Sequence, residues 1–189
     1  VLESLAGVDR RRSLPDLHRD HFRRWFARHQ ASRGQQRNDS RPLLVLLDDC
    51  FTTFQEPRIG QSAVALLEKA GYQVVFPDNV DSLCCGQPFA SKGYTEQAEH
   101  KRQELIGALL HASRGGLDPI YCDTSPCTLR LVQDLGDVRL DLYDPVRFIR
   151  THLMDRLDFT PQEAPIAVHV TCSTQHLGES QALIDLARQ

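Results

Sequence analysis

The sequence predicts an α/β fold in which helices flank a mainly parallel β-sheet. Two observations lead to this fold class. Short apolar segments alternate with longer amphipathic segments along most of the chain, which is the order of elements in βαβ units. The first apolar segment, residues 43–47, is continuous rather than alternating. Such a run is typical of a strand that is buried on both faces of a parallel sheet.

The region before this strand is predicted to contain one helix and one linker. Residues 14–29 carry apolar side chains at helical spacing, with arginines on the other face, which predicts an amphipathic helix that packs on a neighbour. The apolar positions are Leu14, Leu17, Phe22, Trp25 and Phe26. Residues 30–42 are polar and contain Gly and Pro, as linkers do.

A complete βαβ unit is predicted from the first strand onward. Asp48 and Asp49 follow this strand and are interpreted as residues that cap a turn or helix. A helix is expected from Pro57 to Ala70, because proline suits a first helical turn and Gly71 suits the position after the last one. A second strand is expected over residues 72–76.

The same alternation continues to the end of the chain. Residues 77–92 show no pattern of a regular element. The later predicted elements are a helix over 94–113, a strand over 118–122, a helix over 127–135, a strand over 138–143, a short helix over 145–157 and a strand over 166–170.

Two segments of the chain resemble each other. Residues 43–50 and 165–172 are both apolar runs that end in cysteine and precede a polar loop. Such repetition predicts two similar half-domains. We therefore expect a linker region over residues 1–42, a first half-domain over 43–160 and the start of a second, truncated half-domain over 161–189.

Composition limits the possible functions. The 189 residues, 41% of them hydrophobic, can form one or two domains with a buried core. No apolar run approaches the roughly 20 residues of a membrane span, so we expect no integral membrane segment. Arginine is concentrated in the first 37 residues, but contacts between domains explain such an arm and we expect no nucleic-acid partner. The chain begins without Met, and we interpret it as a piece of a larger cytoplasmic protein.

Six cysteines are the most informative residues. They are Cys50, Cys84, Cys85, Cys122, Cys127 and Cys172. The sequence shows no secretion signal, which favours metal binding or redox chemistry over a disulfide framework. In an open α/β sheet, ligands bind beyond the carboxyl ends of the strands. Cys50 and Cys172 each follow a predicted strand, and Cys122 ends one.

Four of these cysteines are expected to meet at one edge of the sheet. Cys127 lies at a predicted helix start, where the helix dipole favours a thiolate. The adjacent Cys84 and Cys85 can present two thiolates to one polynuclear cluster, and Gly86 lets the backbone approach closely. Four thiolates suit an iron–sulfur cluster or zinc. A thiol-redox site is a further alternative, and we interpret Cys122 as a core residue.

The order and spacing of these motifs resemble a known family. Cys50, then Cys84-Cys85-Gly86, then the segment DTSPCT that contains Cys127 are similar to the cysteine-rich CCG domain. This domain occurs in heterodisulfide reductase, in the iron–sulfur component of glycolate oxidase and at the C-terminal end of FAD-linked D-lactate or D-2-hydroxyglutarate dehydrogenases. The segment 11–29 resembles the linker helix of the last group. The chain departs from the pattern in lacking a CxxC ending.

The resemblance implies a Rossmann-like sheet and an iron–sulfur cluster, of the 4Fe–4S kind, held by Cys50, Cys84, Cys85 and Cys127. It also implies that Cys172 is a ligand of a second, incomplete site. The expected role is electron transfer. FAD in an upstream part of the parent protein takes a hydride from a D-2-hydroxy acid, and the cluster passes electrons to a quinone or a carrier protein. The resemblance implies no catalytic residue here, and a cytoplasmic location with peripheral attachment to the inner membrane through the parent.

Overall fold

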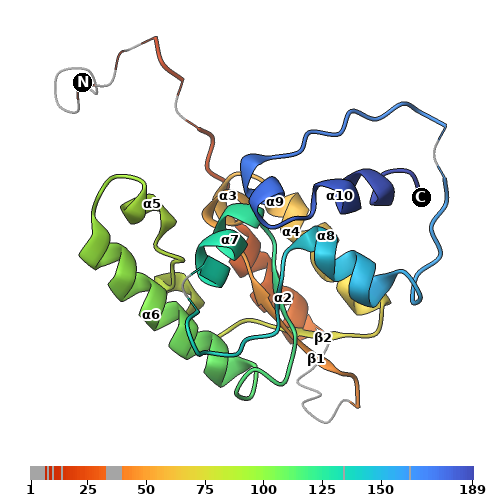
Figure 1. Ribbon diagram of the computed structural model, residues 1–189, viewed down its shortest axis with the longest axis horizontal. Coiled ribbons are helices and arrows are strands. Elements are labelled where there is room, and N and C mark those ends of the chain that lie inside the picture. The colour runs from red at the N-terminus through yellow and green to blue at the C-terminus, as the bar shows by residue number, and fades with distance from the viewer. Residues whose placement is uncertain are drawn as a thin grey trace.

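The computed structural model describes residues 7, 9, 11–13, 15–32, 40–133, 135–161 and 163–189. It confirms the α/β fold class: a four-stranded sheet, parallel throughout, is flanked by helices (Figure 1). The elements are α2 Phe22–Ser32, β1 Leu43–Leu47, α3 Cys50–Phe54, α4 Pro57–Lys69, β2 Gln73–Val75, the 3-10 turn η1 Val80–Ser82, α5 Gln87–Ala90, α6 Thr95–Ala112, β3 Ile120–Cys122, α7 Ser125–Gln133, β4 Leu142–Tyr143, α8 Pro145–Phe148, the π-helical turn η2 Ile149–Leu153, α9 Cys172–His176 and α10 Ser180–Leu186.

The sheet has a separate hydrophobic core on each of its two faces. The strand order is β2-β1-β3-β4, so the chain moves outward from β1 to β2 and then crosses back to β3. Successive residues of β1 point to opposite faces: Leu44 and Leu46 lie in one core, and Val45 and Leu47 lie in the other. The first core contains residues of α2, α4 and α8, and the second contains residues of α6 and α7.

The N-terminal helix differs from its prediction at both ends. It begins at Phe22 rather than near residue 14 and continues to Ser32. Leu17 is 68% exposed and so contributes nothing to the core, whereas Phe22 and Phe26 are buried beneath the helix. Leu14 and most of the predicted linker, residues 33–39, lie outside the described residues.

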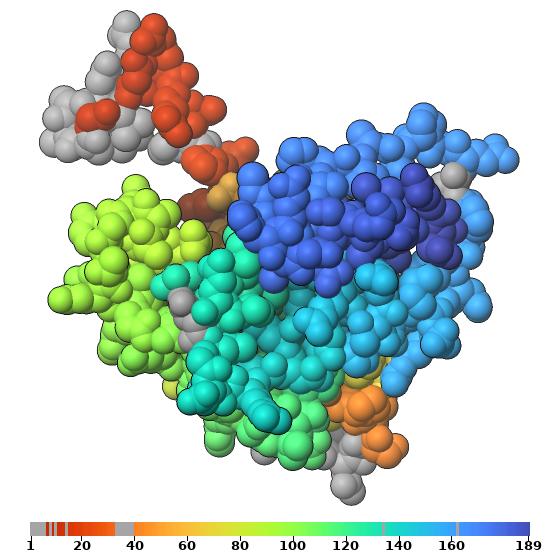
Figure 2. Space-filling view, in the orientation of Figure 1, coloured from red at the N-terminus to blue at the C-terminus, as the bar shows by residue number. Residues whose placement is uncertain are grey.

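The C-terminal part of the chain differs most from its predicted structure. Residues 166–170 form no strand, and Ile166 and Val168 are 65% and 40% exposed. The prediction is wrong because an apolar alternating run becomes a strand only when a neighbouring strand supplies hydrogen-bond partners, and the sheet already ends at β4. The segment instead runs over the surface as an extended stretch that leads to α9, drawn in blue in Figure 1 and Figure 2.

Smaller differences occur elsewhere. Residues 77–92 contain the short helical elements η1 and α5. The strand predicted over 138–143 is reduced to two residues, and the helix predicted over 145–157 becomes α8 followed by η2. Among the described residues, no helix combines the length and the apolarity needed to cross a membrane.

The contact between α2 and α4 depends on a glycine. A Cβ atom added at Gly60 would lie 2.7 Å from ring atoms of Phe22, and Phe22 is fully buried. We expect Gly60→Ala to lower the free energy of unfolding by about 1–3 kcal/mol, the usual cost of overpacking a core. Gly107→Ala is the matched control, because Gly107 also lies within a helix and has nothing within 4 Å of the added carbon.

Denaturant unfolding of both variants measures this difference. Gly107→Ala is expected to be neutral or to stabilise the protein by about 0.5–1 kcal/mol, since alanine favours a helix interior over glycine. Equal effects of the two substitutions would mean that the Phe22 ring does not limit the space at Gly60.

Candidate metal centre

The candidate site lies where the strand order reverses. β1 and β3 are neighbours in the sheet, and the chain leaves them toward opposite sides. In open α/β sheets, the crevice beyond the carboxyl ends of such strands is the usual place for a ligand. The backbone N–H of Asp123 donates to the carbonyl of Leu47 at 3.0 Å, which extends the pairing of these strands up to the site.

A pocket of about 220 Å³ occupies this edge. Cys50, Cys84, Cys85 and Cys127 all line it, and these are the four cysteines that the sequence analysis selected. They come from three separate stretches of chain: the segment after β1, the loop before α5 and the segment after β3. The rest of the lining consists of Arg23, Leu47, Asp48, Asp49, Leu83, Gln87 and Pro88.

Each stretch holds its cysteine by local interactions. Asp49 caps α3, because its Oδ1 accepts a hydrogen bond from the backbone N–H of Thr52 at 2.7 Å, and Cys50 is the first residue of that helix. Cys127 is the third residue of α7. Its Sγ lies 3.0 Å from the Sγ of Cys85.

Gly86 forms the turn that directly follows Cys84 and Cys85, both of which line the pocket. This residue has a φ of +82° and precedes the first residue of α5. A Cβ atom at this position would lie 2.4 Å from the backbone carbonyl oxygen of Ala98, so the loop can pack on α6 only with glycine there. The backbone N–H of Gly86 also donates to the Sγ of Cys84, at 3.4 Å.

The surroundings of the pocket raise the pKa values of its four thiols. The hydrogen bond between Cys85 and Cys127, aided by burial, raises the pKa of Cys85 to about 12. The pKa of Cys84 rises further, through its hydrogen bond with Cys85 and then through burial, and burial also raises the pKa of Cys50. At Cys127 the hydrogen bond from Cys85 lowers the pKa, but burial and nearby acidic groups together raise it above its ordinary value. The helix-dipole effect expected for Cys127 is therefore outweighed.

The donor set fits a thiophilic metal or cluster, although the thiols are not yet arranged around one. Across the residues that the structure describes, no group of three or more His, Cys, Asp or Glu side chains is already spaced to hold a metal ion. Binding must displace the thiol protons, which removes the hydrogen bond that now draws Cys85 toward Cys127. Four sulfur donors on one pocket are the ligands that iron–sulfur clusters and zinc take.

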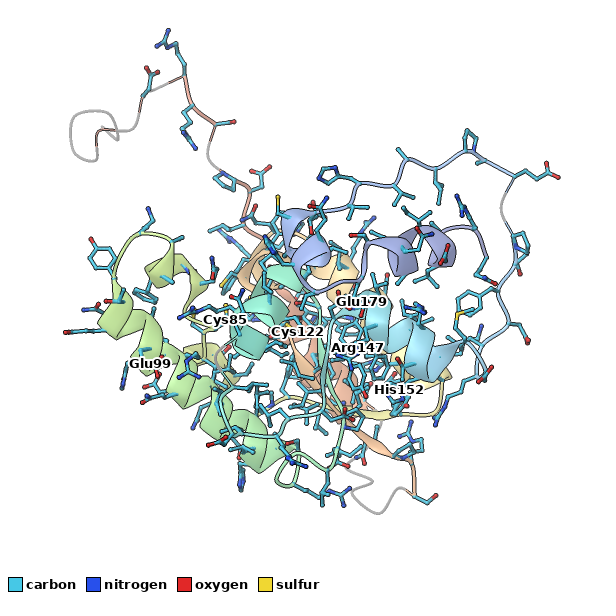
Figure 3. The ribbon with its side chains drawn as sticks, viewed as in Figure 1. Cys85, Glu99, Cys122, Arg147, His152 and Glu179 are labelled. Carbon is cyan, nitrogen blue, oxygen red and sulfur yellow. The ribbon has the colours of Figure 1, made fainter. Side chains whose placement is uncertain are left out.

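The remaining cysteines lie outside this pocket. Cys122 is fully buried at the end of β3, in the core beneath α6 and α7, which confirms its interpretation as a core residue (Figure 3). Cys172 is exposed and lines a different hollow with Gln87, Arg130 and His176. It does not follow a strand, contrary to the expectation, because residues 166–170 form none.

Two residues of the site were not recognised in the sequence. Arg23 was one of several arginines on the polar face of the predicted helix, but its side chain is only 12% exposed and forms an ion pair with Asp48. Asp48 was interpreted as a capping residue, and only its neighbour Asp49 has that role. The one available signal in the sequence was the position of Asp48, an acidic residue between a buried strand and a cysteine. Nothing in the spacing of the arginines indicated which of them would pair with it.

A family comparison agrees with this site. Residues 44–131 match the model of the CCG family, described as a cysteine-rich domain. Over its whole length the chain is 22% identical to one component of the anaerobic glycerol-3-phosphate dehydrogenase of Escherichia coli, and the matched region covers 48% of that relative. The chain thus spans about half the length of that relative.

Other relatives match shorter regions. Lactate utilization protein A of Bacillus pumilus is 34% identical over 31% of this chain and 24% of its own length. An uncharacterized iron–sulfur protein of Methanococcus maripaludis is 24% identical over 70% of this chain and 25% of its own length. No solved structure matches the chain significantly.

Proposed function

Because residues 44–131 of this chain belong to the CCG family of cysteine-rich domains, we propose that the pocket binds an iron–sulfur cluster through Cys50, Cys84, Cys85 and Cys127. The observation that carries the proposal is the meeting of these four side chains, from three separate stretches of chain, on one pocket at the carboxyl edge of the sheet. Thiolate ligands of this number are those of 2Fe–2S and 4Fe–4S clusters. The name of the iron–sulfur relative supports the same cofactor.

The function that follows is electron transfer within a flavin-linked oxidoreductase. A bound cluster accepts and passes on single electrons, and the protein sets its potential by burial and by hydrogen bonds to sulfur. We propose that the electrons come from FAD in another part of the parent chain or complex and go to a quinone or a carrier protein. In this proposal the chain supplies the ligands of the cluster, and the organic substrate binds in another part of the parent chain or complex.

The substrate class is the least direct part of the proposal. The names of two relatives refer to a glycerol-3-phosphate dehydrogenase and to lactate utilization, both of which concern small hydroxylated compounds. Together with the motif resemblance, they support a D-2-hydroxy acid such as lactate, glycolate or 2-hydroxyglutarate. A cytoplasmic location, with peripheral attachment to the inner membrane through the parent protein, belongs to the same proposal.

The start of α9 resembles the start of α3. Cys172 begins α9 as Cys50 begins α3, and in each case the preceding residue caps the helix by accepting a hydrogen bond from the backbone N–H three residues on. The accepting side chains are those of Asp49 and Thr171. We propose that residues 161–189 start a second half-domain and that Cys172 is a ligand of a second, separate site.

The alternatives use the same cysteines. A structural zinc site needs the same four thiolates and transfers no electrons. A thiol-redox site exchanges a disulfide through one or two reactive cysteines, whereas four cysteines line this pocket. The number of sulfur donors supports metal or cluster binding over thiol exchange.

Metal analysis of the whole chain distinguishes these functions. The chain is purified without oxygen, supplied with iron and sulfide, desalted, and assayed for iron, zinc and acid-labile sulfide per chain. We expect iron with a matching amount of sulfide. Zinc without sulfide would make the site structural, and a protein that retains neither metal after this treatment would contradict the proposal.

A further inference from the structure

Arg23 brings a positive charge to the cysteine pocket from outside the matched family segment. It lies on α2, ahead of residues 44–131, and its side chain reaches the pocket with only 12% of its surface exposed. Within the described part of the chain, the lining of this pocket contains one positively charged side chain, that of Arg23. An arginine keeps its charge in any protein environment.

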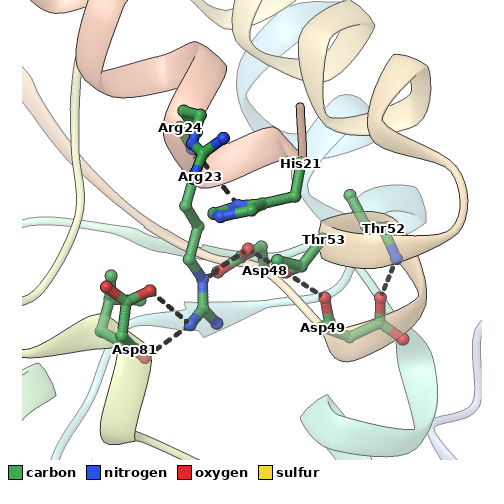
Figure 4. A network of polar contacts seen from close by, with 9 residues as sticks. His21, Arg23, Arg24, Asp48, Asp49, Thr52, Thr53 and Asp81 are labelled. Atoms are coloured by element: carbon green, nitrogen blue, oxygen red, sulfur yellow. Dashed lines mark hydrogen bonds and ion pairs between the residues drawn. The ribbon is translucent and has the colours of Figure 1, made fainter. Parts of the chain in front are cut away.

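The guanidinium group is fixed by several contacts (Figure 4). Its Nε lies 3.2 Å and 3.0 Å from the two carboxylate oxygens of Asp48. Its Nη1 donates to the carbonyl of Val80 at 2.8 Å and lies 3.3 Å from Oδ1 of Asp81. None of these contacts uses Nη2.

Asp48 is held equally firmly. Its side chain is fully buried, and the hydroxyl of Thr53 donates to its Oδ2. A buried carboxylate that is paired in this way has little freedom to reorient when the charge in the pocket changes. The two partners therefore form a fixed pair of opposite charges at the wall of the pocket.

We propose that Arg23 is a positioning residue that raises the reduction potential of the cluster bound by this pocket, an inference that rests on the proposed function. A cluster held by four thiolates is anionic and gains one further negative charge when it accepts an electron. A fixed cation at the pocket wall stabilises the more negative, reduced state. In a poorly solvated pocket this stabilisation is larger than it would be in water.

The fixed pair offers a graded test, because each partner can lose its charge alone. Arg23→Gln leaves the pocket one unit more negative, Asp48→Asn leaves it one unit more positive, and the double variant restores the original net charge. Arg23→Lys keeps the charge and loses the forked geometry. Arg28→Gln is the control on the same helix, since Arg28 pairs with Asp20 at the exposed surface.

The measurement is a potentiometric titration of the reconstituted whole chain, with dithionite as reductant and visible absorbance as the readout. We expect Arg23→Gln to be harder to reduce than the unmodified chain by about tenfold in the reduction equilibrium, which is about 59 mV for one electron. Asp48→Asn is expected to shift the potential in the opposite direction. Arg23→Lys, Arg28→Gln and the double variant should remain close to the unmodified chain.

Iron per chain, measured on every variant, separates charge from folding. If Arg23→Gln fails to retain iron, the opposite shift of Asp48→Asn and the unchanged potential of Arg23→Lys still test the proposal. A potential unaffected by Arg23→Gln, or an Arg23→Lys variant that shifts as far as Arg23→Gln, would overturn the role of the charge. An unmodified chain that binds no iron would overturn the proposed function and this inference together.

Discussion

Replacing Cys85 by serine is expected to reduce the iron retained per chain by more than tenfold. Cys85 is buried, lines the pocket and lies 3.0 Å from the sulfur of Cys127. Changes behind the direct ligands of a metal site typically cost about 10–100-fold in affinity, so loss of a direct thiolate ligand should cost at least as much. Iron and acid-labile sulfide, measured on chains reconstituted and desalted side by side, give the result.

A buried cysteine outside the pocket serves as the control for this substitution. Cys122→Ala removes a buried sulfur from the adjoining core and should cost about 1 kcal/mol of unfolding free energy, comparable to other losses of one buried heavy atom, while leaving the iron in place. Equal iron loss in Cys85→Ser and Cys122→Ala would mean that the assay reports folding rather than ligation.

Gly86→Ala should disrupt the site without removing any sulfur. The left-handed conformation at φ +82° costs an alanine roughly 1–2 kcal/mol. The added carbon would also lie 2.4 Å from the carbonyl oxygen of Ala98, so the loop must move away from α6. Because Cys84 and Cys85 directly precede this residue, the movement displaces two of the four thiols. We expect iron retention to fall about as far as in Cys85→Ser.

Gly93→Ala separates the clash from the backbone strain. Gly93 has nearly the same φ, +83°, but nothing lies within 4 Å of an added carbon. Gly93→Ala should lower the free energy of unfolding only by the roughly 1–2 kcal/mol that the left-handed backbone costs an alanine, and it should keep its iron. A Gly86→Ala variant that retained as much iron as Gly93→Ala would show that the approach to Ala98 is not needed for the site.

Local patterns in the sequence were sufficient to predict a parallel sheet and the meeting of Cys50, Cys84, Cys85 and Cys127 at one edge of it. The continuous apolar run at 43–47 and the helix predicted from Pro57 to Ala70 correspond to β1 and α4, since burial and capping depend on neighbouring residues. Parallel strands bring their carboxyl ends to one edge, which is why cysteines far apart in the chain could be expected to meet there.

Features that depend on distant parts of the chain were not predictable in this way. Residues 166–170 have a strand pattern but no strand beside them. The ion pair of Arg23 with Asp48 joins residues 25 positions apart, one on a helix and the other after a strand that the predicted linker separates from it. Each of these depends on a partner that only the folded chain supplies.

The most direct test of the central claim is electron paramagnetic resonance of the reconstituted whole chain, recorded during stepwise reduction and reoxidation. The account predicts a signal that appears or disappears reversibly with one electron per cluster, and that is absent from Cys85→Ser. A chain that carries its metal through the full cycle with no change in signal would have a structural site, and the pocket would not transfer electrons.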